Sequence, residues 1–203
     1  MCWRSFKVDN PFILILFYSR GGKTAQLAQH LAHGVESVAG MDARLRTVPS
    51  LNTDDDESDY LVAEVADLRD CAGLALGSPT RFGTMAAPMK HWWEQTTPQW
   101  LNGDLVNKPA CVFTSTSSLH GGQEATLLSM MLPLLHHGLV IMGTPYTEAL
   151  LHTTESGGTP YGVSHWDKDK KALTREEIQL AQAQGKRLAT MAYQLHNGNN
   201  TAL

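Results

Sequence analysis

The residues most suited to chemistry in this sequence form a short loop of small and hydroxyl-bearing side chains after an apolar run. The run is Phe12-Ile-Leu-Ile-Leu-Phe-Tyr18, and the loop is Ser19-Arg-Gly-Gly-Lys-Thr24. Glycines allow a tight turn and close approach to a ligand, and helical spacing begins at Lys23. Because the amino end of a helix attracts anions, and the Ser19 and Thr24 hydroxyls add donors, we expect a phosphate site. A glycine-rich strand-to-helix turn without a ligand has the same pattern.

The loop matches neither of the common nucleotide-binding motifs. Gly22-Lys23-Thr24 resembles the end of the nucleoside-triphosphate loop, G-x-x-x-x-G-K-[ST], but Phe17 stands where that motif needs its first glycine. The dinucleotide motif G-x-G-x-x-G is absent as well. The sequence therefore predicts a compact loop that holds one monophosphate through hydroxyls and backbone amides.

Two further polar loops follow apolar runs later in the chain. Ser78-Pro-Thr-Arg-Phe-Gly83 follows the run 73–77, and Ser115-Thr-Ser-Ser-Leu-His-Gly-Gly122 follows the run 110–114. If each run is a parallel strand, each loop lies at the carboxyl end of its strand, which is where ligands bind in open α/β sheets.

The elements that must position these loops alternate between strand and helix patterns. The run 12–18 is apolar throughout, as in a strand buried on both faces, whereas 42–48 alternates like an edge strand. The pattern predicts an α/β fold, a doubly wound five-stranded parallel sheet of order 2-1-3-4-5. In that order the first, third and fourth strands are neighbours, so their loops meet in one crevice. The expected strands are 12–18, 42–48, 73–77, 110–114 and 139–143. One helix is expected to begin at 23, and others are expected at 61–68, at 85–95, at 123–137 and from 174 onward. The segment 145–173 is expected to be irregular.

Length and composition favour one intracellular enzyme domain. The 203 residues are enough for a single core, with 1–11 as an N-terminal extension, 12–197 as the domain and 198–203 as a tail. A net charge of -4 argues against nucleic acid as the main partner, and no stretch is long enough to span a membrane. Three well-separated cysteines without a C-x-x-C pair indicate neither a disulfide framework nor a metal site. The acidic run at 54–59 is interpreted as a solvated loop, and the expected location is cytoplasmic.

Five motifs together carry a family resemblance that covers about residues 12–195. They are Ser19-x-Gly-Gly-x-Thr24, Gly77-Ser-Pro-Thr-Arg-Phe-Gly-Thr-Met85, Gly121-Gly-Gln-Glu124, His136-His-Gly138 and Gly157-Gly-Thr-Pro-Tyr-Gly162. In combination they resemble the WrbA family of flavodoxin-like NAD(P)H:quinone oxidoreductases, which bind FMN. The resemblance implies hydride transfer from NADH or NADPH to FMN and then to a quinone at the same place, hence ping-pong kinetics. It also implies a homotetramer, a dimer of dimers, and helix 85–95 with Trp92 and Trp93 is compatible with a subunit surface.

The resemblance assigns a role to each loop. Arg81 and His137 are the implied catalytic residues, with His137 reaching the flavin from this chain or from a neighbouring subunit, and Trp100 lines the implied quinone pocket. The implied FMN contacts are Ser19, Arg20, Gly21, Gly22, Lys23 and Thr24 for the phosphate, Thr80, Arg81, Phe82 and Gly83 beside the isoalloxazine, and Ser115, Thr116, Ser117, Ser118, Leu119, His120, Gly121 and Gly122 around the pyrimidine edge.

Two departures from the family pattern concern nicotinamide binding. Gly21 stands where some members carry a tyrosine that is implicated in nicotinamide binding, and the stretch 117–120 is longer by one residue. Two other functions remain open on the same fold. One is a flavodoxin-like single-electron carrier, and the other is an interaction protein that has lost the flavin.

Overall fold

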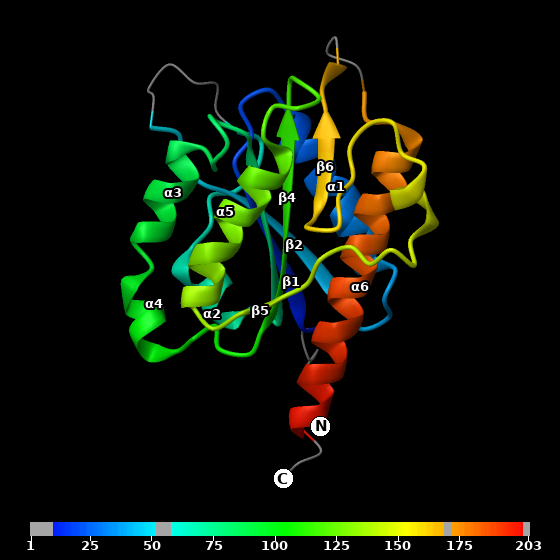
Figure 1. Cartoon of the computed structure of the whole chain (residues 1–203). Helices are drawn as coiled ribbons and strands as arrows, with labels where there is room; N and C mark the ends of the chain where they lie inside the picture. The colour runs from blue at the N-terminus through cyan, green and yellow to red at the C-terminus, as the bar shows by residue number, and fades with distance from the viewer. Residues whose placement is uncertain (1–9, 52–57, 169–171, 201–203) are drawn as a thin grey trace.

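The computed structural model describes residues 10–51, 58–168 and 172–200 (Figure 1). Most of the predicted extension 1–11, most of the acidic run at 54–59 and the end of the predicted tail 198–203 lie outside these residues. Among the described helices, none combines the length and the apolar character that crossing a membrane requires.

The sheet is parallel throughout and has the predicted order, β2-β1-β3-β4-β5. In β1 every side chain is buried, whereas β2 is half-exposed along most of its length, as expected for an edge strand. The strands on this path are β1 (Phe12–Phe17), β2 (Asp42–Thr47), β3 (Gly73–Pro79), β4 (Pro109–Thr116) and β5 (Val140–Ile141).

A sixth strand, β6 (Val163–Trp166), corrects the expectation that 145–173 is irregular. The strand β5 pairs with Pro109 and Ala110 of β4, and β6 pairs with the end of the same strand, from Phe113 to Thr116. The two short strands therefore share one edge of β4, and the chain between them, which includes the 3-10 helix η1 (Ala149–His152), leaves the sheet and returns. The predicted strand 139–143 is shorter than expected, because β6 rather than β5 pairs with the last residues of β4.

Helices cover both faces of the sheet (Figure 1). One core contains Ile13, Ile15 and the apolar sides of α1 and α6, and the other contains Leu14 and the apolar sides of α2, α3 and α5. Alternate side chains of β1 thus enter opposite cores, which is why the strand is apolar throughout. The helices are α1 (Lys23–Glu36), α2 (Val65–Asp70), α3 (Ala87–Glu94), α4 (Thr97–Asn102), α5 (Gln123–His136) and α6 (Arg175–Asn200).

The helices differ from the expectation in their bounds, in their number and in the burial of two tryptophans. The predicted helix 61–68 begins only at Val65. The residues before it are extended, because Val62 forms a parallel bridge with Thr47 at the end of β2. Helix α4 was not predicted. Trp92 and Trp93 are 9% and 5% exposed and belong to the core, so they do not form a subunit surface.

Candidate functional site

The loops that follow β1, β3 and β4 meet at one cavity of about 480 Å³ at the carboxyl edge of the sheet. This volume lies within the range of small-molecule sites, roughly 300–1,000 Å³. The predicted convergence of three loops is therefore confirmed. The cavity is lined by Arg20, Gly21, Lys23, Thr24, Pro79, Thr80, Arg81, Phe82, Ser115, Thr116, Ser117, Ser118, Gly121 and Asp167.

The first loop turns directly into α1. Gly22 is the N-cap residue and has a φ of 78°, a left-handed conformation that glycine adopts without strain. The Ser19 hydroxyl accepts a hydrogen bond from the backbone N–H of Ala25 at 3.2 Å and so fixes the start of the helix. Ser19 and Gly22 therefore shape the turn, while Lys23 and Thr24 in the first helical turn line the cavity.

The second loop is a tight reversal whose tip faces solvent. The backbone N–H groups of Arg81 and Thr84 each donate to the carbonyl of the other residue, at 2.9 and 3.0 Å. Phe82 and Gly83 between them have φ values of 51° and 80°. The turn leaves the Phe82 ring fully exposed at the edge of the cavity, so an apolar, flat side chain is available to a ligand.

The third loop packs against the second through glycine. A Cβ added to Gly122, whose φ is 95°, would lie 3.1 Å from the Cα of Gly83, so the two backbones are in close contact. A Cβ on Gly121 would lie 2.4 Å from the hydroxyl oxygens of Thr116 and Ser118. Gly122 therefore favours glycine by its conformation and its close contact, and a side chain at Gly121 would displace the two hydroxyls.

The remaining residues of this stretch divide between strand, cavity and solvent. Ser115 and Thr116 belong to β4 rather than to the loop, and both line the cavity. Leu119 and His120 are exposed and do not line it. Ser115 to Ser118 and Gly121 therefore line the cavity, and the FMN contacts assigned to this stretch stay a prediction.

Trp100 and His137 lie at the other end of the sheet. Helix α5 starts beside the third loop, and its 14 residues extend about 21 Å, so His137 is carried away from the cavity. The His137 Nε2 lies 3.1 Å from the Thr96 hydroxyl, and the Trp100 indole N–H donates to the His136 carbonyl at 2.9 Å. Within one chain, neither residue lines the cavity.

His137 is also largely withdrawn from solvent. It is 8% exposed, and its ring packs edge-to-face on Trp93 with centroids 5.0 Å apart. Burial lowers the pKa of its imidazole, and the neighbouring His136 lowers it further. Both effects favour the neutral form of the ring.

One functional residue was missed by sequence reasoning. Asp167 directly follows β6, lines the cavity, and places its carboxylate oxygen Oδ1 3.4 Å from the Lys23 Nζ. The strand that positions it was not predicted, so no local signal placed this residue at the site. Within the described residues it is the single acidic side chain that lines the cavity, beside the cationic Arg20, Lys23 and Arg81.

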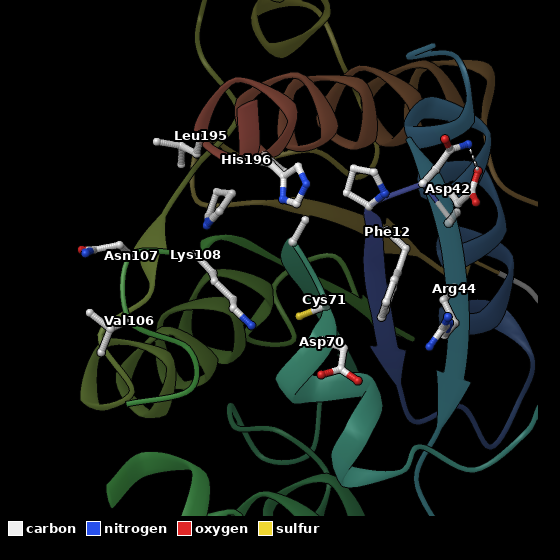
Figure 2. Close-up of a pocket in the computed structure, with 16 residues that line it drawn as sticks. Phe12, Asp42, Arg44, Asp70, Cys71, Val106, Asn107, Lys108, Leu195 and His196 are labelled. Carbon is white, nitrogen blue, oxygen red and sulfur yellow. Dashed lines mark hydrogen bonds between the residues drawn. The ribbon is translucent and has the colours of Figure 1, made fainter. Parts of the chain in front are cut away.

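A larger pocket of about 830 Å³ lies at the opposite, amino ends of the strands. Figure 2 shows that its side chains come from the starts of β1 and β2, from the chain before β3, from the chain before β4 and from the end of α6. Its cations already have partners, since Arg44 pairs with Asp67 at 2.8 Å and the Lys108 ammonium donates to the Arg69 carbonyl. It contains none of the three loops, so we assign the functional site to the smaller cavity.

The sheet order and the position of the cavity define a flavodoxin-like α/β protein. A flavodoxin, WrbA-like protein from Agrobacterium tumefaciens superimposes with a TM-score of 0.66 at 19% identity, covering 91% of this chain and 98% of its own. A flavodoxin from the domain Archaea gives a TM-score of 0.62 at 16% identity, covering 90% of this chain and 99% of its own. At these identities the two structures support the fold.

The sequence comparisons define the family. The family model of NADPH-dependent FMN reductase matches residues 13–149. Two relatives with the name NAD(P)H dehydrogenase (quinone), from Trichlorobacter lovleyi and Chromohalobacter salexigens, are each 38% identical to this chain and cover 90% of it and 98% of their own length. The chain belongs to the NADPH-dependent FMN reductase family, and its predicted WrbA-like character is confirmed.

Proposed function

We propose that this NAD(P)H:quinone oxidoreductase holds FMN in the three-loop cavity and transfers two electrons in each of two successive half-reactions. The observation that carries the proposal is the convergence of the loops after β1, β3 and β4 on one cavity with cationic and hydroxyl side chains. When bound there, FMN supplies the chemistry that accepts hydride from NADH or NADPH and passes two electrons to a quinone.

The first loop has the donors that a phosphate group requires. Lys23 contributes a cation, Thr24 a hydroxyl, and α1 presents its positive dipole end at the same wall of the cavity. Arg20 adds a second cation at the edge of the cavity. We assign the phosphate of FMN to this wall.

The second loop suits the flavin ring and its substrates. The Arg81 guanidinium donates to the Thr80 carbonyl at 2.9 Å and is thereby held beside the cavity. We assign to it the stabilisation of negative charge on the ring system, which makes it the catalytic residue that this chain supplies. The exposed Phe82 ring offers an apolar face on which a nicotinamide or a quinone can stack.

The test is spectroscopic and uses the whole chain. We expect FMN to bind, and we expect NADH or NADPH to bleach the flavin absorbance in the absence of oxygen. Benzoquinone should then restore the absorbance. In steady-state assays, double-reciprocal plots at several quinone concentrations should be parallel, as in ping-pong kinetics. Comparison of NADH with NADPH gives the donor preference. Bleaching that a quinone does not reverse contradicts the reductase and favours an electron carrier, and a failure to bind FMN favours the flavin-free interaction protein.

We further propose that the chain works as a homotetramer in which a neighbour supplies Trp100 and His137 to the cavity. Helix α5 exposes a stripe of leucines spaced by three or four residues, and further apolar side chains are exposed on α4, before β4 and in β5. Trp100 of α4 lies at the end of α5, since its indole N–H donates to the His136 carbonyl. Large exposed apolar patches are typical of subunit interfaces. These side chains are Leu128, Leu132, Leu135, Trp100, Leu101, Val106 and Val140.

The assembly is tested by introducing a charge into this surface. Leu132→Asp, at a side chain that is 61% exposed, is expected to shift the mass measured by light scattering toward smaller species and to lower quinone reduction. Tyr193→Asp on α6, at an apolar position that is 40% exposed, is the control and should leave the mass unchanged. A wild-type protein that is monomeric at micromolar concentration contradicts the proposal.

We place the enzyme in the cytoplasm. The two described cysteines, Cys71 and Cys111, are free thiols, as in proteins of reducing compartments. Burial raises the pKa of Cys71 to about 11 and that of Cys111 to about 12, so both stay protonated and chemically inert.

A further inference from the structure

The inference concerns an acidic side chain in a cavity otherwise suited to a phosphate. Asp167 and Lys23 form an ion pair at 3.4 Å, with side chains that are 23% and 16% exposed. Both line the cavity. A carboxylate in this position lies close to where a bound phosphate meets Lys23, so the two anions compete for one cation.

The same carboxylate oxygen also faces a second group. The His165 Nε2 lies 3.9 Å from the Asp167 Oδ1. Both atoms are buried, and among the described residues neither has a hydrogen-bond partner, although Oδ1 keeps its ion pair with Lys23. The distance is too long for a hydrogen bond. Since Nδ1 faces the Glu177 carboxylate, the imidazole can donate to Asp167 only when Nε2 also carries a proton. In that doubly protonated form, a small movement of the Asp167 side chain would give Nε2 the acceptor that it lacks.

His165 is held firmly in this orientation. Its Nδ1 lies 2.7 Å from the Glu177 Oε2, and the two side chains are 1% and 0% exposed. Glu177 also completes a capping box at the start of α6, since it accepts from the Thr174 N–H at 2.9 Å while the Thr174 hydroxyl accepts from the Glu177 N–H at 3.2 Å. It further accepts from the backbone N–H groups of Gly157 and Trp166, at 2.9 and 3.0 Å. Because Glu177 is fixed by so many bonds, the imidazole has little freedom to turn away from Asp167.

We propose that Asp167 is a specificity-determining residue that competes with the cofactor's phosphate for Lys23, and that His165 is the positioning residue that receives Asp167 when the phosphate takes Lys23. The competition sets how strongly the cavity favours FMN over riboflavin, which has the same ring system and ribityl chain but no phosphate. The proposal rests on the assignment of FMN to this cavity.

Removing the charge of Asp167 gives a direct test. We expect Asp167→Asn to bind FMN about tenfold more tightly, the order that a partly exposed unit charge near a phosphate can supply. Riboflavin affinity should change less than twofold. Both constants are measured by quenching of flavin fluorescence at low ionic strength, and the FMN gain should shrink as salt is added. Asp70→Asn, which removes an equal charge from the exposed pair with Arg69, is the matched control and should change neither constant.

A second variant tests the role of His165. His165→Gln is expected to weaken FMN binding severalfold, because Asp167 loses its alternative partner and stays on Lys23, while riboflavin binding is retained. In the Asp167→Asn background the same substitution should have no further effect on FMN affinity. Thermal unfolding of each variant identifies any general loss of structure. If His165→Gln does not fold, the comparison of Asp167→Asn with the wild type still tests the inference.

Two results overturn the inference. One is unchanged FMN affinity in Asp167→Asn. The other is equal weakening of FMN and riboflavin, which would mean that Asp167 accepts a hydrogen bond from the ribityl chain. Failure of the wild-type protein to bind FMN instead refutes the proposed function itself, so the two failures are distinguishable.

Discussion

The hydroxyl oxygens of Thr24 and Ser115 lie 2.8 Å apart, and both side chains are buried. Thr24 belongs to the first turn of α1, and Ser115 lies near the end of β4. Both residues line the cavity. One hydrogen bond thus ties the wall assigned to the phosphate to the strand that carries the third loop.

The first prediction tests this bond. Thr24→Val keeps the shape of the side chain but leaves the Ser115 hydroxyl without its partner, so we expect a loss of about 1–3 kcal/mol in the free energy of unfolding, measured in urea. Adding Ser115→Ala should cost less than the sum of the two single losses. Thr190→Val is the control, because the exposed Thr190 hydroxyl bonds only to the carbonyl of Lys186 in its own helix. If the losses from Thr24→Val and Ser115→Ala simply add in the double variant, the two hydroxyls are not coupled by a hydrogen bond.

The second prediction separates stability from cofactor affinity at Ser19. Ser19→Asp places a carboxylate where the hydroxyl now accepts from the Ala25 N–H. A carboxylate at the start of a helix is favourable by about 0.3–1 kcal/mol, so the protein should be at least as stable as the wild type. The same charge repels a phosphate, so the yellow colour of bound FMN should be lost.

The control at this position is Ser19→Asn, which keeps an acceptor without a charge. It should retain most of the FMN affinity. Normal FMN affinity in Ser19→Asp would contradict the assignment of the first loop to the phosphate.

The third prediction concerns the exposed Phe82. The left-handed backbone conformation is less favourable by roughly 1–2 kcal/mol for a residue that has a Cβ. Phe82 adopts this conformation, with a φ of 51°. Phe82→Gly should therefore be about 1 kcal/mol more stable than Phe82→Ala in urea unfolding. Both variants should raise the KM for benzoquinone to the same extent, since both remove the ring. A KM equal to that of the wild type would exclude Phe82 from the substrate contact.

The three loops could be predicted because their signals are local. Gly22, Gly83 and Gly122 all adopt positive φ at loop positions, and each follows a strand whose apolar side chains identify it. The order of the strands followed from the alternation of Asp42–Thr47, which is half-exposed as an edge strand must be. For these features, the residues that determine the structure lie close together in the sequence.

The missed features depend on contacts between distant residues. Strand β6 has only four residues, among them Ser164 and His165, and it forms because β4 offers an edge that β5 leaves unpaired. Asp167 reaches Lys23 only after that pairing is made. In the same way, the family resemblance placed His137 at the flavin, but the length of α5 separates the two within one chain.

The fourth prediction is a pH dependence that originates at Glu177. Burial acts to raise the pKa of this carboxyl, but hydrogen bonds from His165, Ser156 and the backbone N–H groups of Thr174 and Trp166 outweigh it and lower the pKa to about 2. The ordinary value is 4.5, so the unfolded chain takes up the proton first as the pH falls. The stabilisation is therefore complete above about pH 5 and disappears as the pH falls toward 2.

We expect Glu177→Gln to lose about 3 kcal/mol of unfolding free energy at pH 7, the order that a shift of this size represents. Its stability should also fall less steeply than that of the wild type between about pH 5 and pH 2, so the two curves converge in acid. Glu176→Gln, one residue earlier on the same helix, should remain parallel to the wild type. Urea unfolding at a series of pH values measures all three. If the Glu177→Gln curve keeps the wild-type slope, then the buried carboxylate does not act as the charged anchor that holds His165 toward Asp167.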